Sequence, residues 1–170
     1  MKENIKIGII GLGQRGDVML ENPIIPMMKN GAGIEITAVC DLLPDRVAAA
    51  AEKIEKAGFP RPAELTDYKE LLKIKELDAV YIAVSWETHA EVAVAAMHAG
   101  KYVGLEAGGA YSLEDCYKLV RAYEETGTEL MLMENCCYGR RELMALNMAR
   151  KGVLGNIMPV SYTHLTLPTN

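Results

Sequence analysis

Short apolar runs alternate along the chain with longer segments of helical pattern. The apolar runs predict five strands, at residues 5–10, 34–41, 78–84, 101–106 and 128–135. Helical patterns lie between and after them, at 44–58, 65–73, 87–100, 113–126 and 141–152. Continuously apolar strands are typical of parallel sheets covered on both faces, and the alternation of strand and helix indicates βαβ units. The pattern therefore predicts an α/β fold with a parallel sheet.

One segment does not fit this alternation of strand and helix patterns. Between Gly16 and Gly33 the pattern is helical, but Pro23 and Pro26 interrupt it. Proline lacks an N–H group and clashes with the preceding turn. We therefore expect a helix that is broken or ends near Asn22.

Composition narrows the class of protein. Half of the 170 residues are apolar, 24% are charged, and the net charge is −5. An acidic chain without basic clusters is a poor partner for nucleic acid, and no apolar run approaches the roughly 20 residues of a membrane span. The four cysteines have no metal-ligand spacing and are expected to be buried, reduced thiols. We expect a cytoplasmic protein with no metal site, no membrane contact and no nucleic-acid partner.

A glycine motif follows the first strand directly. The sequence GLGQRG matches G-x-G-x-x-G, with Gly11, Leu12, Gly13, Gln14, Arg15 and Gly16. The first glycine allows a tight turn, the second allows backbone to approach a pyrophosphate, and the third allows close packing of helix and strand. The N-terminus of the following helix favours phosphate. The motif predicts a dinucleotide site.

An acid at the end of the second strand supports this prediction. Asp41 is placed to accept hydrogen bonds from the adenosine ribose and would repel a 2′-phosphate. Leu42 stands where a phosphate-binding arginine is expected, although Arg46 lies further along the helix. NAD is therefore the expected cofactor, and NADP is less favoured.

Further polar residues follow the later strands. Ser85, Trp86 and His89 come after the third strand, and Glu106 ends the fourth. Asn135 and Tyr138 come after the fifth strand. Because ligands of open parallel sheets lie beyond the carboxyl ends of the strands, these residues are expected to meet at one edge.

The block AVSWETHAEVAVAAMHAGKYVGLE, together with the glycine motif, resembles the NAD(P)-dependent Gfo/Idh/MocA family of oxidoreductases. The resemblance covers residues 4 to about 158 and implies a doubly wound Rossmann-type domain. It places Ser85, Trp86 and His89 at the nicotinamide half of the cofactor. It matches Glu106 to the glutamate of the family's Glu-Lys-Pro motif and implies a sugar or polyol substrate.

The family's usual acid/base lysine is missing. Its position is Ala107, which is followed by Gly108 and Gly109. One reading is a similarity to NAD-dependent glycosidases of the α-N-acetylgalactosaminidase type, which also lack this lysine. The resemblance then implies transient oxidation at sugar C3, elimination of the C1 group, addition of water and return of the hydride. In that case Tyr138 is the nearest candidate for a substrate-side role.

Two alternatives to the glycosidase are a dehydrogenase whose base comes from elsewhere and a non-catalytic nucleotide-binding module. Sugar-directed redox chemistry ranks first, with the glycosidase close behind. The catalytic residue is not assigned.

The end of the chain suggests a fragment. The family continues into a second α/β domain that holds the substrate and aids formation of homo-oligomers, and this chain lacks it. Residues 159–170 include SYTHLTLPTN, which resembles a translated sequencing adapter. We expect an NAD-binding domain over residues 1–158, truncated before the second domain and inactive alone, followed by a non-native or disordered tail.

Overall fold

The computed structural model describes residues 4–156. The chain divides into two compact units, the first ending at Met133 and the second beginning at Glu134. The described part of the second unit holds the 3-10 helix η2 (Cys136–Tyr138) and the helix α7 (Arg140–Arg150). Among the described residues, no helix is long and apolar enough to cross a membrane. The predicted tail, 159–170, lies outside the described residues, and the boundary at residue 158 stays a prediction.

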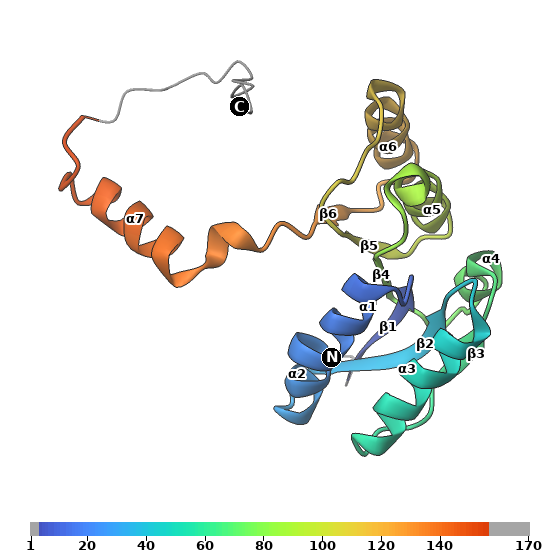
Figure 1. Cartoon of the computed structure of the whole chain (residues 1–170). Helices are drawn as coiled ribbons and strands as arrows, with labels where there is room; N and C mark the ends of the chain where they lie inside the picture. Colours follow the sequence, from blue (N-terminus) through green and yellow to red (C-terminus); the bar gives the residue numbers. More distant parts are fainter. Residues whose placement is uncertain (1–3, 157–170) are drawn as a thin grey trace, which may run out of the picture. The chain divides into compact units, whose positions relative to one another are not determined.

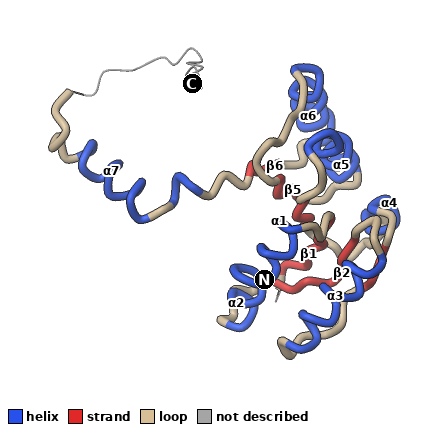
Figure 2. Tube along the Cα trace, in the orientation of Figure 1, coloured by secondary structure: helices blue, strands red, loops and turns tan. Residues whose placement is uncertain are grey.

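The first unit is built on a six-stranded sheet (Figures 1 and 2). Its strands are β1 (Ile5–Ile10), β2 (Ile34–Cys40), β3 (Ala63–Leu65), β4 (Ala79–Ile82), β5 (Tyr102–Leu105) and β6 (Leu130–Leu132). They lie in the order β3-β2-β1-β4-β5-β6, and every neighbouring pair is parallel. The chain starts in the middle and winds outward in both directions, which is the doubly wound Rossmann order. The predicted fold class is confirmed.

The central strands are buried on both faces, as their apolar sequences predict. Ile9 belongs to one hydrophobic cluster and Ile10 to the other, because successive strand residues point to opposite faces. Helical residues between positions 20 and 54 fill the first cluster together with β1 and β2, and helical residues between positions 71 and 122 fill the second. The longer helices are α3 (Pro44–Lys56), α5 (Trp86–His98) and α6 (Leu113–Thr126), and α4 (Tyr68–Leu72) is short.

The helix after the glycine turn passes through its prolines instead of ending at Asn22. It runs as α1 (Gln14–Met19), the π-helical turn η1 (Leu20–Ile24) and α2 (Ile25–Lys29). Pro23 lies inside η1. The wider π turn is one way for a helix to continue past an interruption of its hydrogen-bond ladder. The helix therefore does not end at the predicted position; it changes locally from α-helical to π-helical geometry and continues.

The pattern missed β3. This strand has only three residues, and two of them are exposed, so no apolar run marks it. It pairs with the carboxyl end of β2 through Ala38, Val39 and Cys40. The partner strand, rather than a local hydrophobic pattern, specifies β3.

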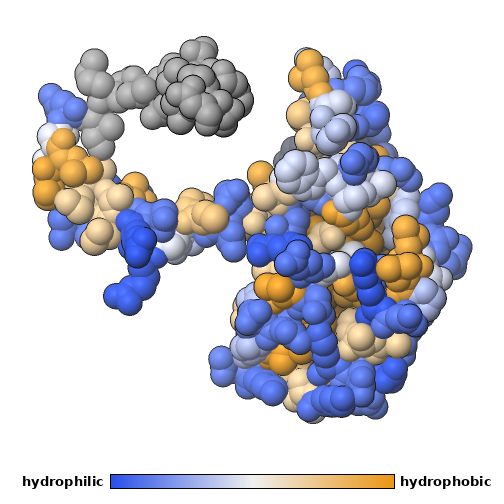
Figure 3. All heavy atoms as spheres, viewed as in Figure 1, coloured by the Kyte–Doolittle hydropathy of each residue, from blue (hydrophilic) through white to orange (hydrophobic). Residues whose placement is uncertain are grey.

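Helix α6 is less buried than its apolar stripe predicts. Ala122 is its one buried residue, whereas Val120 and Tyr123 are about half exposed. The expectation of buried thiols holds for Cys40 and is wrong for Cys116, which lies exposed on this helix, and for Cys136 and Cys137, which are exposed in η2. The helix packs mainly on α5 at the short-stranded end of the sheet, where there is less surface to cover it. On the face drawn in Figure 3, apolar atoms reach the surface among hydrophilic ones.

Candidate functional site

The turn between β1 and α1 is shaped by two glycines. Gly11 has a φ of 93°, and a Cβ atom there would lie 2.5 Å from the carbonyl oxygen of Ala83, just after β4. A Cβ atom on Gly16 would collide with the carbonyl oxygen of Gly11. The packing of the protein itself therefore requires glycine at both positions.

Gly13 has no such constraint. The nearest atom to a Cβ placed there is Nη1 of Arg46 at 3.6 Å, an ordinary contact. Gly13 is also the N-cap of α1, and no side chain caps that end of the helix. The fold leaves room above Gly13, and the backbone at this end of α1 is open to an approaching anion.

Asp41 is held by backbone groups. Its Oδ2 accepts a hydrogen bond from the N–H of Leu12 at 2.7 Å, and its Oδ1 accepts one from the N–H of Leu43 at 3.0 Å. Nη1 of Arg46 lies 3.7 Å from Oδ2. The carboxylate thus ties the glycine turn to the end of β2, with a cation on one side.

Glu106 is held by side chains. It follows β5 and is 7% exposed. Its Oε1 accepts a hydrogen bond from the hydroxyl of Tyr81 at 2.7 Å and lies 3.0 Å from Nη2 of Arg15. Its Oε2 accepts only a longer bond, 3.3 Å, from the N–H of Ala107 among the described residues. These contacts bring together the glycine turn, β4 and the end of β5.

Opposing influences act on the Glu106 carboxyl group. Burial favours its neutral form, but the bonds from Arg15 and Tyr81 outweigh burial, and its pKa is lowered. Burial and the bond to Glu106 raise the pKa of Tyr81, so its hydroxyl remains a donor. Glu106 is therefore an ionised acceptor at neutral pH.

His89 lies in the first turns of α5 and is 1% exposed. Neither ring nitrogen makes a hydrogen bond of good geometry with the described residues. Burial lowers its pKa, against smaller opposing effects of the Val84 backbone and of Glu106. The imidazole is therefore neutral at pH 7, and its predicted place beside the nicotinamide stays a prediction.

The loops after β4 and β5 touch each other. Gly108 has a φ of 96°, and a Cβ atom there would lie 2.7 Å from Nε1 of Trp86. The indole is 60% exposed. Ser85 is the N-cap of α5, and its hydroxyl pairs with that of Thr88 at 3.1 Å. An exposed indole thus rests on the backbone two residues beyond Glu106.

Two predicted residues belong to the second unit. Asn135 is the N-cap of η2, and Tyr138 is the last residue of η2. Their predicted roles at the nicotinamide and substrate sides stay predictions.

The sequence missed the contribution of Tyr81. It lies in the middle of an apolar strand, between Val80 and Ile82, which face the opposite cluster. The period-2 alternation of a strand could have shown that Tyr81 faces the side of α1. Sequence placed Arg15 among the cofactor-binding residues of the glycine motif but did not predict its pairing with Glu106, because that partner lies far along the chain.

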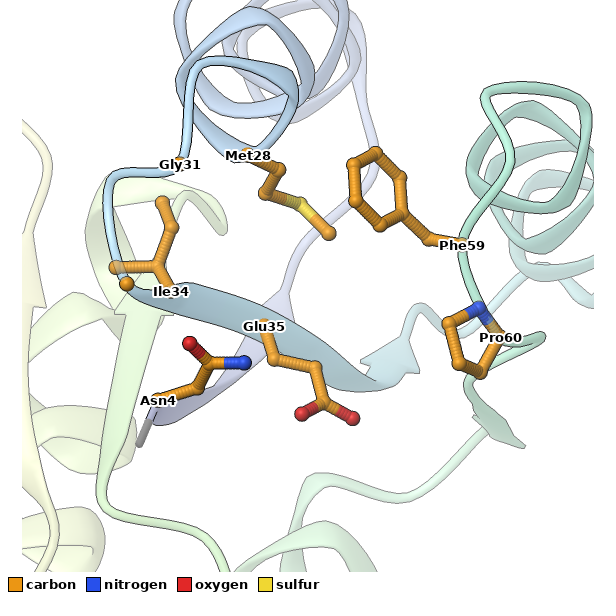
Figure 4. A pocket seen from close by; sticks show the side chains of 8 residues that line it. Asn4, Met28, Gly31, Ile34, Glu35, Phe59 and Pro60 are labelled. Carbon is orange, nitrogen blue, oxygen red and sulfur yellow. The ribbon is translucent and has the colours of Figure 1, made fainter. Parts of the chain in front are cut away.

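A separate hollow lies away from these residues (Figure 4). Its volume is about 480 Å³, and it lies at the amino ends of β1 and β2. Its lining residues are Asn4, Met28, Gly31, Gly33, Ile34, Glu35, Phe59 and Pro60. The glycine turn, Asp41 and Glu106 all lie at the carboxyl ends of their strands, so this hollow is not part of the candidate site.

The strand order and the glycine turn define a class of protein. The turn lies where the winding direction reverses, between β1 and β4, which is where Rossmann domains bind dinucleotides. Residues 5–134 match the family model described as "Oxidoreductase family, NAD-binding Rossmann fold", the Gfo/Idh/MocA family. The chain belongs to this family, and the matched residues are its NAD-binding domain.

Individual relatives agree with this assignment. "Glycosyl hydrolase family 109 protein 1" of Bacteroides thetaiotaomicron is 40% identical over 169 residues, which cover 95% of this chain and 35% of that protein. A variant of KijD10, a 3-ketoreductase from Actinomadura kijaniata in complex with TDP-benzene and NADP, has a TM-score of 0.73 and 26% identity, covering 91% of this chain and 46% of the other. The chain spans about a third of the length of the curated relatives it matches.

Proposed function

We propose that this chain binds NAD across the carboxyl edge of its sheet. Gly11, Gly13 and Gly16 would hold the pyrophosphate, and Asp41 would hold the adenosine ribose. The support is the room above Gly13, because protein packing demands glycine at the other two positions and not at this one. A pyrophosphate that must approach the backbone supplies the reason for the glycine there.

The nicotinamide half would lie at the ends of β4 and β5. Glu106 supplies an ionised acceptor whose Oε2 has spare capacity for a ribose hydroxyl. Trp86 offers an exposed aromatic surface next to Gly108, two residues beyond Glu106. Ser85, His89 and Asn135 complete the set that we assign to this half.

The choice of NAD over NADP rests on Asp41. Its carboxylate only accepts hydrogen bonds when ionised, so it suits two ribose hydroxyls and repels a 2′-phosphate. Arg46 works in the other direction, because its guanidinium lies 3.7 Å from this carboxylate. We assign the preference to NAD because Asp41 is fixed by two backbone bonds, whereas the Arg46 side chain is 49% exposed.

Calorimetric titration of the chain with NAD⁺ and with NADP⁺ tests this proposal. We expect NAD⁺ to bind at least about tenfold more tightly, a difference of about 1.4 kcal/mol. Equal affinities would contradict the role of Asp41. Absence of binding by either dinucleotide would contradict the proposed site as a whole.

For the whole protein we propose a carbohydrate substrate and a net hydrolytic reaction. Two observations favour hydrolysis over simple dehydrogenation: Ala107 stands where the family's lysine is expected, and the 40%-identical relative is named a glycosyl hydrolase. When bound, NAD would take a hydride from sugar C3 and later return it. The chain's own residues would hold the cofactor, and Tyr138 would serve the substrate side.

A sugar dehydrogenase or ketoreductase is the second candidate. It is favoured by the structural likeness to KijD10, which is named a 3-ketoreductase. Its acid/base group would then come from a residue other than Ala107. Any homo-oligomer through the second domain stays a prediction.

The two candidates differ in their net chemistry. The full-length protein should release the aryl group from an aryl glycoside in the presence of NAD⁺ without accumulating NADH. It should also incorporate deuterium at sugar C2 when the reaction is run in D₂O, because elimination removes that proton. Stoichiometric NADH with no aryl release would favour the dehydrogenase.

A further inference from the structure

Arg15 connects the two ends of the candidate site. It lies in the first turn of α1, within the glycine motif that follows β1, and its Nη2 lies 3.0 Å from Oε1 of Glu106, beyond β5. The Arg15 side chain is 43% exposed, whereas that of Glu106 is 9% exposed. The pair spans two strand ends that are separated in the sheet by β4.

We propose that Arg15 is a positioning residue that fixes Oε1 of Glu106, so that Oε2 remains the acceptor for the nicotinamide ribose. This inference rests on the proposed binding of NAD. It assigns to Arg15 a task distinct from phosphate binding, although Arg15 lies within the phosphate-binding turn.

Contacts from Arg15 and Tyr81 hold one oxygen of the Glu106 carboxylate. Arg15 and Tyr81 both point at Oε1, and the only other contact to the carboxylate among the described residues is the longer one from Ala107 to Oε2. The ion pair with Arg15 and the hydrogen bond from Tyr81 both engage Oε1. The other oxygen keeps free lone pairs for a hydroxyl donor.

Burial and the charge of Arg15 act in opposite directions on the pKa of Glu106. A carboxylate that is 7% exposed loses most of its hydration, and burial alone would raise its pKa. The bond and charge of Arg15 are the largest opposing influence, and the Tyr81 bond adds to it. Without Arg15, burial is opposed mainly by a neutral hydroxyl, so the pKa of Glu106 rises.

Titratable and charged groups act on Glu106 from three neighbouring elements in the described part of the chain. Arg15 comes from α1, Tyr81 from β4 and His89 from α5. Burial keeps His89 neutral at pH 7, and the Tyr81 hydroxyl stays protonated throughout the accessible range. Arg15 is thus the permanent cation of this group.

A pH series with Arg15→Gln tests the proposal, with NAD⁺ as the probe in calorimetric titrations from about pH 6 to about pH 8.5. For the unchanged chain we expect an affinity that varies by less than about twofold over this range, because Glu106 stays ionised. For Arg15→Gln we expect an affinity that falls progressively toward the acid end, as Glu106 takes up a proton. Arg15→Met, which keeps part of the apolar stem, should behave likewise and replaces Arg15→Gln should that variant fail to fold.

Three further variants test whether protonation of Glu106 causes the pH dependence of NAD⁺ affinity. Arg15→Lys retains a cation and should restore a flat profile. Combining Arg15→Gln with Glu106→Gln should abolish the pH dependence, whereas a contribution from His89 would persist. Arg61→Gln is the matched control, because Arg61 pairs with Glu55 and Glu64 on the surface, and it should bind as the unchanged chain does.

The outcomes separate this inference from the function on which it rests. A loss of affinity in Arg15→Gln that is equal at every pH would overturn the inference, since it would show that Arg15 acts on phosphate charge alone. Retention of full affinity at every pH would also overturn it. Failure of the unchanged chain to bind NAD⁺ at any pH would overturn the proposed function itself.

Discussion

The two carboxylates of the site are held in opposite ways. Asp41 is fixed by backbone N–H groups from the glycine turn and from its own loop. Glu106 is fixed by the side chains of Arg15 and Tyr81. The backbone donors to Asp41 form wherever this βαβ unit folds, whereas the side-chain donors to Glu106 depend on particular residues of α1 and β4. The adenosine end should therefore be sensitive to changes in backbone shape, and the nicotinamide end to changes of single side chains.

The largest expected effect lies in the glycine turn. Gly16→Ala should destabilise the chain by roughly 3 kcal/mol, because the new methyl group meets the Gly11 carbonyl oxygen. Gly13→Ala should cost no more than about 1 kcal/mol of stability, since alanine is a poorer N-cap for α1 than glycine, and should still weaken NAD⁺ binding about tenfold. Urea denaturation and calorimetry measure the two quantities. Equal stability losses in the two variants would show that Gly13 is there for packing.

The next effect concerns Asp41. Asp41→Ala should weaken NAD⁺ binding by about tenfold or more and cost about 1–3 kcal/mol of stability, since the part-buried Leu12 N–H loses its acceptor. Damage to the turn alone would weaken NAD⁺ and NADP⁺ equally, whereas loss of the ribose acceptor shifts the preference toward NADP⁺. Asp45→Ala, a change of an exposed acid at the start of α3, is the control and should alter neither affinity. An unchanged NAD⁺ to NADP⁺ ratio in Asp41→Ala would contradict the assignment.

A smaller effect is expected at the nicotinamide end. Tyr81→Phe removes the buried hydroxyl bond to Glu106 and should lower the free energy of unfolding by about 1 kcal/mol. Tyr102→Phe is matched to it, because the Tyr102 hydroxyl donates to Glu129 at 2.8 Å on the surface. That control should change stability by less than about 0.5 kcal/mol. Similar losses of stability in both variants would contradict the prediction that a buried hydrogen bond to a carboxylate stabilises the chain more than an exposed one.

The smallest effect is a pH dependence of stability. The pKa of Glu106 is lowered in the folded chain, so its contribution to stability is present above its unfolded pKa, about 4.3, and is lost as the pH falls through the lower folded value. Glu106→Gln should therefore lose less stability than the unchanged chain between about pH 5 and pH 3. Urea denaturation at several pH values measures this difference. Parallel profiles would show that the Glu106 pKa is not lowered by folding.

The contrast between contacts within one βαβ unit and contacts between distant residues also explains which features could be predicted from the sequence. Apolar runs along the whole chain specify the Rossmann sheet, whereas the glycine turn and Asp41 lie within the single unit β1-α1-β2, where their spacing specifies them. Strand β3 was not predicted because its two exposed residues give no hydrophobic signal. The π-helical turn η1 was not predicted because a proline inside a helix has several structural outcomes. The bonds from Arg15 and Tyr81 to Glu106 join residues far apart in sequence, and only the packing of β1, β4 and β5 brings them together.

The central claim is that one dinucleotide lies across both carboxylates, with its nicotinamide beside Trp86. Trp86 is the only tryptophan of the chain. Exciting it while NADH is titrated in should give sensitised emission from the dihydronicotinamide, which saturates with the calorimetric affinity and is lost in Trp86→Phe. Saturable binding of NADH without energy transfer from Trp86 would place the nicotinamide elsewhere and contradict the account.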